Sequence, residues 1–176
     1  MTGQRYLRNK PGFTNLIGKT GVSKADARID AIGSVDEASA ALGLAKSFIR
    51  DQERKDMLNT CQQDLSTIMA YLAGWGGNEQ KAGTSNVDEA FSRLEENISR
   101  LEKQVCLPKQ FILSGDSSAS GSLDLARTIV RRAERNLVGL FQSMEHTDEA
   151  VLEYLNRLST LCFLLEVAET GSKNSQ

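Results

Sequence analysis

Apolar residues recur at steps of three and four along most of the chain, which is the spacing of one buried face of an α-helix. Five such stretches are separated by polar or glycine-containing segments. Their apolar stripes begin at Val35, Leu58, Val87, Leu123 and Val151. Because most of the connections are short, neighbouring helices are expected to run antiparallel. The pattern therefore predicts an all-α protein, a five-helix up-down bundle.

Cap and breaker residues predict where these helices begin and end. Ser34 is followed three residues later by Glu37, the spacing of a capping box, so the first helix is expected to begin there. A similar signal at Asp26 leaves an earlier start, near Ser23, open. The other four helices are expected over about 51–72, from Val87 to a stop at Pro108, from Leu123 after a Ser/Gly loop at 114–122, and from beyond Thr147.

The two ends of the chain lack this periodicity. Residues 1–22 contain Pro11, Gly12, Gly18 and Gly21, which predict an arm, ordered or mobile, ahead of the bundle. The bundle is expected over 23–170 and a polar tail over 171–176. A length of 176 residues suits one domain with a sizeable core.

Charge and composition narrow the function classes. Lys and Arg number 21 against 23 acidic residues, so no basic excess points to nucleic acid or to an anionic membrane surface. No apolar run approaches the ~20 residues of a membrane span, and the N-terminus lacks a signal-peptide core. Cys61, Cys106 and Cys162 lie in apolar helical contexts, so we expect core thiols in a cytoplasmic protein and no metal site.

One polar stripe lies in the fourth expected helix. Asp124, Arg127, Arg131 and Glu134 are spaced by three, four and three residues, so they share one face. Each follows a residue of the apolar stripe, which places this face at the border of the core. The stripe suits an anionic ligand, because arginine binds phosphate and carboxylate bidentately. The alternative is a solvated face with Asp124–Arg127 and Arg131–Glu134 pairs.

Three other residues are weaker candidates. Asp36 lies beside the apolar stripe of the first helix, and Asn156 borders the core in the fifth. A lone carboxylate in this position is usually a surface or cap residue, and a border asparagine is usually a structural hydrogen-bonder. Phe111 is most simply a core residue. Spacing alone leaves both interpretations of each open.

Four segments, in the same order along the chain, resemble one family, the PduO-type ATP:cob(I)alamin adenosyltransferases. They are Gly33–Glu37 with Leu42–Ala45, Phe111–Gly115, Ala126–Arg135 and Tyr154–Ser159. The third reads A-R-T-I-V-R-R-A-E-R and is the most specific, since the family pattern is A-R-T-V-C-R-R-A-E-R. The fourth matches Y-L-N-R-L-S. The resemblance covers roughly residues 12–168.

This resemblance implies a fold, a reaction and partners. The fold is a five-helix bundle that forms a homotrimer with active sites between adjacent subunits. The reaction transfers the 5′-deoxyadenosyl group of ATP to the cobalt of reduced cobalamin and releases triphosphate. Mg²⁺ accompanies ATP. A flavin or flavodoxin reductant and an adenosylcobalamin-dependent acceptor enzyme are the implied partners. Because Co(I) is the nucleophile, no side-chain nucleophile is expected.

The resemblance also implies roles for particular residues. Arg131 and Glu134 would contact ATP, with Arg132 and Arg135 beside them, and Asn156 would hydrogen-bond the nucleotide. Gly12, Thr14 and Lys24 would bind it from the N-terminal arm. Arg127 would form an intersubunit salt bridge with Asp36. Phe111 would be the apolar residue that displaces the lower cobalamin ligand.

The sequence departs from the family pattern mainly at the phosphate-binding arm. The family reads T-K-T-G-D where this chain has Tyr6-Leu7-Arg8-Asn9-Lys10. Ser114 and Asp116 replace the Pro and Gly of F-I-L-P-G-G, Asp124 stands where the family often has His, and Thr160 replaces an Asp. Two functions therefore remain in view. One is an active adenosyltransferase, and the other is a divergent, weakly active or inactive member that binds cobalamin or a nucleotide.

Overall fold

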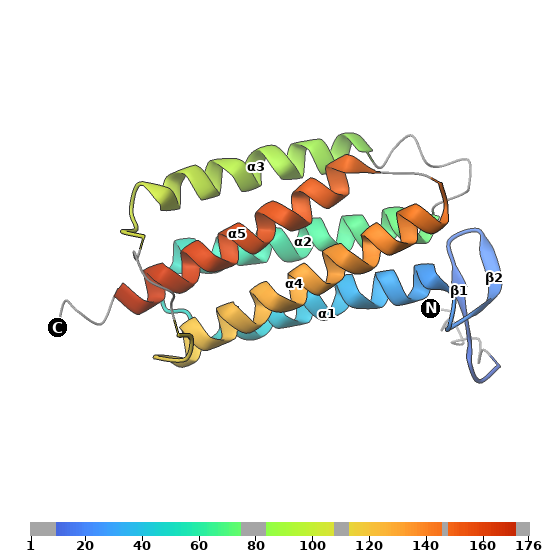
Figure 1. Cartoon of the computed structure of the whole chain (residues 1–176), viewed down its shortest axis with the longest axis horizontal. Coiled ribbons are helices and arrows are strands. Elements are labelled where there is room, and N and C mark those ends of the chain that lie inside the picture. The colour runs from blue at the N-terminus through green and yellow to red at the C-terminus, as the bar shows by residue number, and fades with distance from the viewer. Residues whose placement is uncertain (1–9, 75–83, 108–112, 146–147, 172–176) are drawn as a thin grey trace, which may run out of the picture.

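The computed structural model describes residues 10–74, 84–107, 113–145 and 148–171, which form five helices and one hairpin (Figure 1). The helices are α1 (Ala27–Phe48), α2 (Gln52–Gly74), α3 (Thr84–Glu102), α4 (Ser118–Ser143) and α5 (Glu149–Gly171). Successive helices run in opposite directions along one axis (Figure 1). The predicted all-α, up-down bundle is confirmed.

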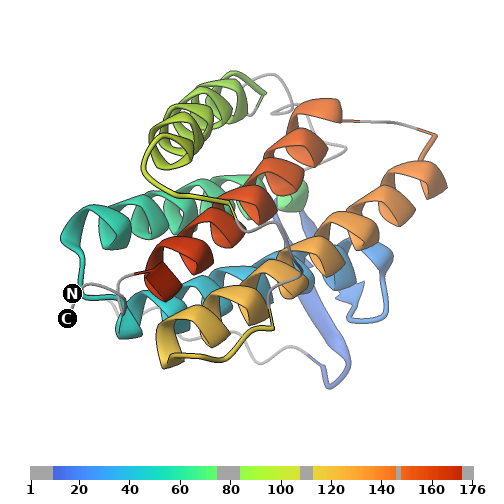
Figure 2. The same ribbon diagram turned by 60° about the vertical axis from the view of Figure 1, so that its left-hand side comes forward.

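The bundle is organised around α4 and α5. Helix α4 packs most extensively against α1 and α5, while α2 packs on α1 and α3 packs on α5. Helix α3 lies beside α5 and reaches only α2 among the other helices, so it forms the outer edge of the bundle (Figure 2). One face of α4 is therefore shared between α1 and α5, and the polar stripe borders that face.

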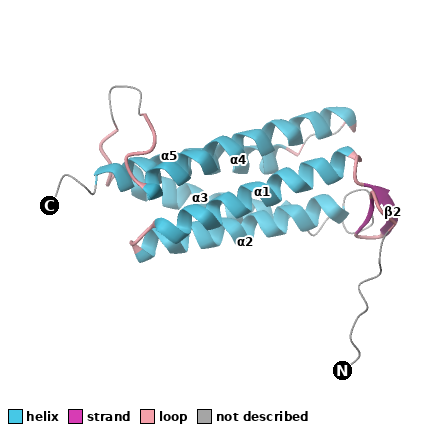
Figure 3. Ribbon diagram, turned by 90° about the horizontal axis from the view of Figure 1, so that it is seen from below, coloured by secondary structure: helices cyan, strands magenta, loops and turns pink. Residues whose placement is uncertain are grey.

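A short hairpin precedes α1. Strands β1 (Phe13–Leu16) and β2 (Lys19–Ser23) pair antiparallel, with Thr14 opposite Val22. Gly18 has φ of 73° in the turn, a conformation that glycine adopts without strain. The hairpin sits at one end of the bundle (Figure 3). The sequence analysis missed it because the strands are short and mostly exposed, so they carry no clear apolar alternation.

Two helices begin earlier than their apolar stripes indicated. Helix α1 is capped by Asp26, which accepts a hydrogen bond from the backbone of Arg28 at 2.9 Å. The expected start at Ser34 is wrong, and the alternative signal at Asp26 is the correct one. Ser34 lies inside the helix, where its hydroxyl bonds the Ala31 carbonyl at 2.7 Å.

The second early start is that of α4. Serines 117 and 120 form a reciprocal capping box, so the helix begins at Ser118, within the loop expected over 114–122. Several residues of this Ser/Gly run could cap a helix. Only the packing of the first turn, which buries Ala119 and Ser120, selects Ser117.

The core holds the predicted apolar stripes of all five helices, with one thiol outside it. Cys61 and Cys162 are buried, as expected, but Cys106 is exposed. The expectation for Cys106 is wrong because α3 ends at Glu102, several residues before the proline expected to stop it. None of the helices in the described ranges has the length and apolar character needed to span a bilayer.

A buried polar network crosses the core between three helices. Asp64 of α2, only 6 % exposed, accepts a hydrogen bond from the Tyr154 hydroxyl of α5 at 3.0 Å. Arg93 of α3 donates to the other carboxylate oxygen at 2.7 Å. A buried carboxylate is stable only when it is paired and hydrogen-bonded, so this network fixes the rotation of α5 relative to α2 and α3.

Candidate active site

The polar stripe of α4 faces the groove between α4 and α5. The residues before its four members, Leu123, Ala126, Val130 and Ala133, are completely buried, so the stripe does border the core. Glu134 accepts a hydrogen bond from the Asn156 side-chain amide of α5 at 3.1 Å. Two residues that the resemblance assigned to ATP therefore come together across the helix pair.

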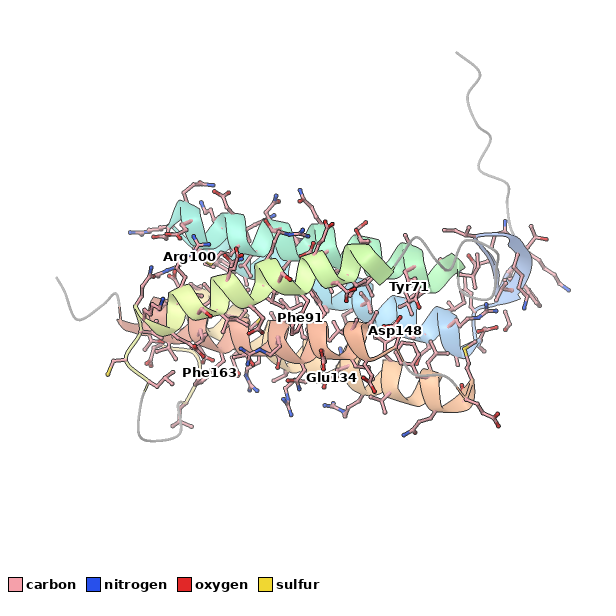
Figure 4. The ribbon with its side chains drawn as sticks, turned by 90° about the horizontal axis from the view of Figure 1, so that it is seen from above. Tyr71, Phe91, Arg100, Glu134, Asp148 and Phe163 are labelled. Atoms are coloured by element: carbon pink, nitrogen blue, oxygen red, sulfur yellow. The ribbon has the colours of Figure 1, made fainter. Side chains whose placement is uncertain are left out.

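A pocket of about 410 Å³ opens at this contact, a volume within the range of small-ligand sites. It is lined by Phe91 of α3, Glu134 of α4, and Leu152, Glu153, Asn156 and Arg157 of α5. Phe91 and Glu134 are shown in Figure 4. The pocket combines apolar side chains with two carboxylates, an amide and a guanidinium, a composition that can orient a polar ligand on an apolar surface.

One wall of the pocket is held by an ion pair between α3 and α5. The Arg157 guanidinium binds Glu95 through two nitrogens, with the Nη2–Oε2 distance at 3.0 Å. Hydrogen bonding by Glu95 raises the pKa of Arg157 above its usual value. The sequence analysis did not assign Arg157, although it belongs to the Y-L-N-R-L-S segment. Nothing in the local pattern marked Glu95 or Phe91.

The other end of the stripe is an ion pair within α4. Asp124 Oδ1 accepts hydrogen bonds from Arg127 Nε at 2.8 Å and Nη2 at 2.7 Å. Burial raises the pKa of Asp124, but hydrogen bonding to Ser114 and Arg127 lowers it by more. The net pKa of Asp124 therefore lies below its usual value. Asp124 is therefore held as the anion that neutralises Arg127.

Arg127 and Asp36 do not meet within one chain. Of the ion pairs in the described ranges, Arg127 takes part in the one with Asp124, while Asp36 is exposed on α1. Asp124 binds one edge of the guanidinium, and within the described ranges no hydrogen bond or ion pair involves Arg127 Nη1. The expected intersubunit contact between Arg127 and Asp36 remains a prediction.

The other arginines of the motif point in different directions. Arg131 and Arg135 are exposed. Arg132 forms an ion pair at 2.5 Å with Glu37 of α1, on the α1–α4 side of the bundle. The expected capping role of Glu37 is thus replaced by a contact between helices.

The residues expected in the arm are held by the hairpin. Thr14 is paired in β1, and the backbone N–H of Lys24 donates to the Gly12 carbonyl at 2.8 Å. This bond closes the open end of the hairpin and brings Gly12 and Lys24 together. The hairpin and the N-terminal end of α4 lie at opposite ends of the bundle (Figure 1). Residues 6–9 of the arm and Phe111 lie outside the described residues.

No preformed metal centre occurs in the described ranges, since they contain no group of three or more His, Cys, Asp or Glu side chains suited to hold an ion.

A bundle of five helices is the fold that the resemblance predicted. The chain belongs to the cobalamin adenosyltransferase family, whose model matches residues 6–169. This match spans the hairpin, helices α1 to α4, α5 up to residue 169, and every site residue discussed above.

Curated relatives agree with this family. The chain is 34 % identical over 164 residues to the corrinoid adenosyltransferase of Citrobacter freundii, covering 90 % of each protein. It is 35 % identical over 156 residues to that of Bacillus subtilis, covering 86 % of this chain and 78 % of the relative. It is also 35 % identical over 158 residues to corrinoid adenosyltransferase PduO of Salmonella typhimurium, but it spans only 47 % of that longer protein.

Solved structures give the same result. A phenylalanine-to-alanine variant of a PduO-type ATP:corrinoid adenosyltransferase from Lactobacillus reuteri, complexed with cobalamin and ATP, superposes with a TM-score of 0.81 at 32 % identity. The alignment covers 93 % of this chain and 91 % of that one. An arginine-to-lysine variant complexed with ATP superposes with a TM-score of 0.75 at 31 % identity.

Proposed function

We propose that this protein transfers the 5′-deoxyadenosyl group of ATP to the Co(I) centre of reduced cobalamin, giving adenosylcobalamin and triphosphate. The cobalt electron pair forms the bond to C5′, the C5′–O bond breaks, and triphosphate leaves with the electron pair of the broken bond. The observation that carries the proposal is the hydrogen bond between Glu134 and Asn156, which line one pocket. Both residues belong to the family motifs, and Arg131 precedes Glu134 by three residues on α4.

The protein's part in this reaction is positioning and charge neutralisation. Glu134 and Asn156 hydrogen-bond the nucleotide and orient C5′ toward cobalt, an effect of proximity. Arg131, exposed at the rim of the groove, neutralises the triphosphate that leaves. Gly12, Thr14 and Lys24 bind phosphate from the hairpin, and Arg132 and Arg135 add positive charge nearby. Phe111 excludes the lower cobalamin ligand, and Mg²⁺ binds together with ATP.

The site is formed between subunits of a homotrimer. The hairpin and the N-terminal end of α4 lie at opposite ends of α1, which is about 33 Å long. Within one chain, the phosphate-binding residues of the hairpin are therefore far from the start of α4, and a second chain is needed to bring these two parts of the site together. Arg127 retains free donors for Asp36 of the neighbouring subunit.

An exposed stripe on α1 supports this assembly. Asp36, Ala40, Leu44 and Phe48 follow one another at steps of four and are exposed. Leu44 and Phe48 are 48 % and 47 % exposed, which is unusual for two large apolar side chains one turn apart. Burying them against the α4–α5 face of a neighbour would place Asp36 near Arg127.

The proposed location of the protein is the cytosol. The free thiols of Cys61 and Cys162 suit a reducing compartment.

The test is direct. Purified protein is incubated with ATP, Mg²⁺ and chemically reduced cobalamin, and adenosylcobalamin is followed by its absorption spectrum while triphosphate is quantified separately. We expect equal amounts of both products above an enzyme-free control. Absence of both would overturn the proposal. Binding of ATP or cobalamin without turnover would instead favour the divergent binding protein.

A further inference from the structure

The pocket at the contact between Glu134 and Asn156 has α5 as its floor. The floor is one face of that helix, formed by four residues at helical steps, Leu152, Glu153, Asn156 and Arg157. Helices α3 and α4 flank this face, and each contributes one side chain. These are Phe91 and Glu134, which lie on opposite sides of α5 (Figure 4). The family motifs assign Glu134 and Asn156 to the nucleotide, and they leave the aromatic wall without a role.

The position of Phe91 is set by the ion pair between α3 and α5. Glu95 Oε2 accepts a hydrogen bond from Arg157 Nη2 at 3.0 Å. Helices α3 and α5 run in the same direction (Figure 1), so one turn before this pair Phe91 lies opposite Glu153. Phe91 packs against the core but is only partly buried, and the rest of its ring lines the pocket. An aromatic face at a pocket wall is a surface on which a planar group can stack.

The charges of the pocket favour a nucleoside over a phosphate chain. Two of its lining residues, Glu134 and Glu153, are carboxylates, and the positive charge of Arg157 is balanced by Glu95. The lining therefore carries an excess of negative charge, which repels triphosphate. Carboxylate oxygens accept hydrogen bonds. The hydroxyl groups of ribose and the amino group of adenine donate them.

Arg131 lies on the other side of the contact between Glu134 and Asn156. It is exposed, and it precedes Glu134 by three residues, about 4.5 Å along α4. Helices α4 and α5 run antiparallel (Figure 1), so this step leads away from Glu153, which precedes Asn156 by three residues. The acidic pocket and the guanidinium of Arg131 therefore lie on opposite sides of one hydrogen bond. A nucleotide bound across that bond has its nucleoside beside Phe91 and its phosphates beside Arg131.

We propose that Phe91 is a nucleobase-binding residue: its ring stacks on the adenine of ATP in the acidic pocket, while the triphosphate extends past Glu134 to Arg131. The inference rests on the proposed function, because ATP is the nucleotide assigned there. In this arrangement C5′, which joins the nucleoside to the triphosphate, lies near the contact between Glu134 and Asn156. Those are the two residues proposed to orient it.

The test separates the two halves of ATP. Isothermal titration gives the Kd for ATP with Mg²⁺, for adenosine and for inorganic triphosphate with Mg²⁺. We expect Phe91→Leu, which keeps the apolar packing but removes the ring, to raise the Kd for ATP and for adenosine on the order of tenfold. Its Kd for inorganic triphosphate should be unchanged. Phe91→Tyr keeps the ring and should bind ATP like the wild type.

Two further variants serve as controls. Arg131→Ala should show the opposite pattern, with weaker binding of inorganic triphosphate and an unchanged Kd for adenosine. Tyr71→Leu removes a ring that packs against the core from α2, outside the pocket, and should leave the Kd for adenosine unchanged.

The outcomes separate the two proposals. An unchanged Kd for ATP in Phe91→Leu would overturn this inference. Equal increases for ATP and inorganic triphosphate would do the same, because a purely structural role of Phe91 produces that result. Weak ATP binding by Phe91→Tyr, an equal loss in Tyr71→Leu, or a wild-type protein that binds ATP no more tightly than inorganic triphosphate would also overturn it. Absence of turnover in a wild-type protein that binds ATP would overturn the proposed function alone, since the Kd values still report on Phe91.

Discussion

Asn156 donates a hydrogen bond to Glu134 across the α4–α5 interface, with Nδ2 and Oε1 3.1 Å apart. The contact lies at the surface of the bundle, so little of its energy is needed for folding. Both side chains can therefore exchange this bond for bonds to a ligand. In the proposed function, both side chains contact the nucleotide.

Removing the amide should weaken ATP binding without unfolding the protein. We expect Asn156→Ala to raise the KM for ATP on the order of tenfold, because one or two hydrogen bonds to the nucleotide are lost. Steady-state kinetics with varied ATP measure this. Asn97→Ala is the control, since Asn97 bonds only Arg100 on the exposed side of α3. Equal KM values for the two variants would contradict the assignment.

The guanidinium of Arg131 should contribute more to ATP affinity than the side-chain amide of Asn156 does. Arg131→Ala is expected to reduce ATP affinity by tenfold or more, because a charge-assisted contact to phosphate is lost. Isothermal titration with ATP and Mg²⁺ measures it, and sedimentation should show an intact oligomer. Arg100→Ala provides a matched loss of charge at an exposed ion pair with Glu53 (Figure 4). Unchanged ATP affinity in Arg131→Ala would remove Arg131 from the site.

Arg127 should affect assembly more than nucleotide affinity. We expect Arg127→Ala and Asp36→Ala each to shift the protein toward monomers in sedimentation velocity, since each removes one side of the proposed intersubunit pair. The double variant should be no worse than either single one. Asp56→Ala, an exposed carboxylate on α2, serves as the control. A wild-type oligomer persisting in both single variants would contradict the contact.

The buried hydrogen-bond network at Asp64 should contribute measurably to the free energy of unfolding. Tyr154→Phe removes the hydroxyl that donates to Asp64 at 3.0 Å and leaves one buried carboxylate oxygen unpaired. We expect a loss of about 1–3 kcal/mol in the free energy of unfolding by urea denaturation. Arg93 still pairs with Asp64 in this variant, so the fold should survive. A change below about 0.5 kcal/mol would show that water replaces the hydroxyl.

The glycine of the L-G-L-A segment should be intolerant of a side chain. A Cβ on Gly43 would lie 2.9 Å from Gln62 Nε2, which donates to the Ser39 carbonyl at 2.9 Å. Gly33, also in α1, has open space around it, so Gly33→Ala should gain up to ~1 kcal/mol of helix propensity. We expect Gly43→Ala to be less stable than Gly33→Ala by about 1–2 kcal/mol, because the bonds of Gln62 are disturbed. Equal stabilities would mean that Gln62 moves aside freely.

Helix faces were predictable from the chain because their apolar spacing is local. The stripes that begin at Val35, Leu58 and Leu123 are all buried as expected. Helix ends were less predictable. Asp26 and Ser34 could each cap α1, several serines could cap α4, and only packing selects the cap of each helix. The hairpin at Phe13–Ser23 has no periodic signal, so its formation depends on pairing and on the turn at Gly18.

The candidate site, too, could be predicted from the sequence only in part. Spacing alone placed Asp124, Arg127, Arg131 and Glu134 on one face of one helix, because the helical repeat fixes neighbours three and four residues apart. Motif resemblance then connected that face to ATP and cobalamin. No local pattern marked Phe91 or Glu95, since each looks like an ordinary helix residue in its own segment.

What the sequence by itself determined is the set of helices, the buried face of each, and the polar stripe at the border of one face. The tertiary structure alone decided which residues on other helices the stripe meets. The register of α4 against α5 pairs Glu134 with Asn156. That register is a property of side-chain packing between two helices, and a repeat of 3.6 residues within one helix carries no information about it.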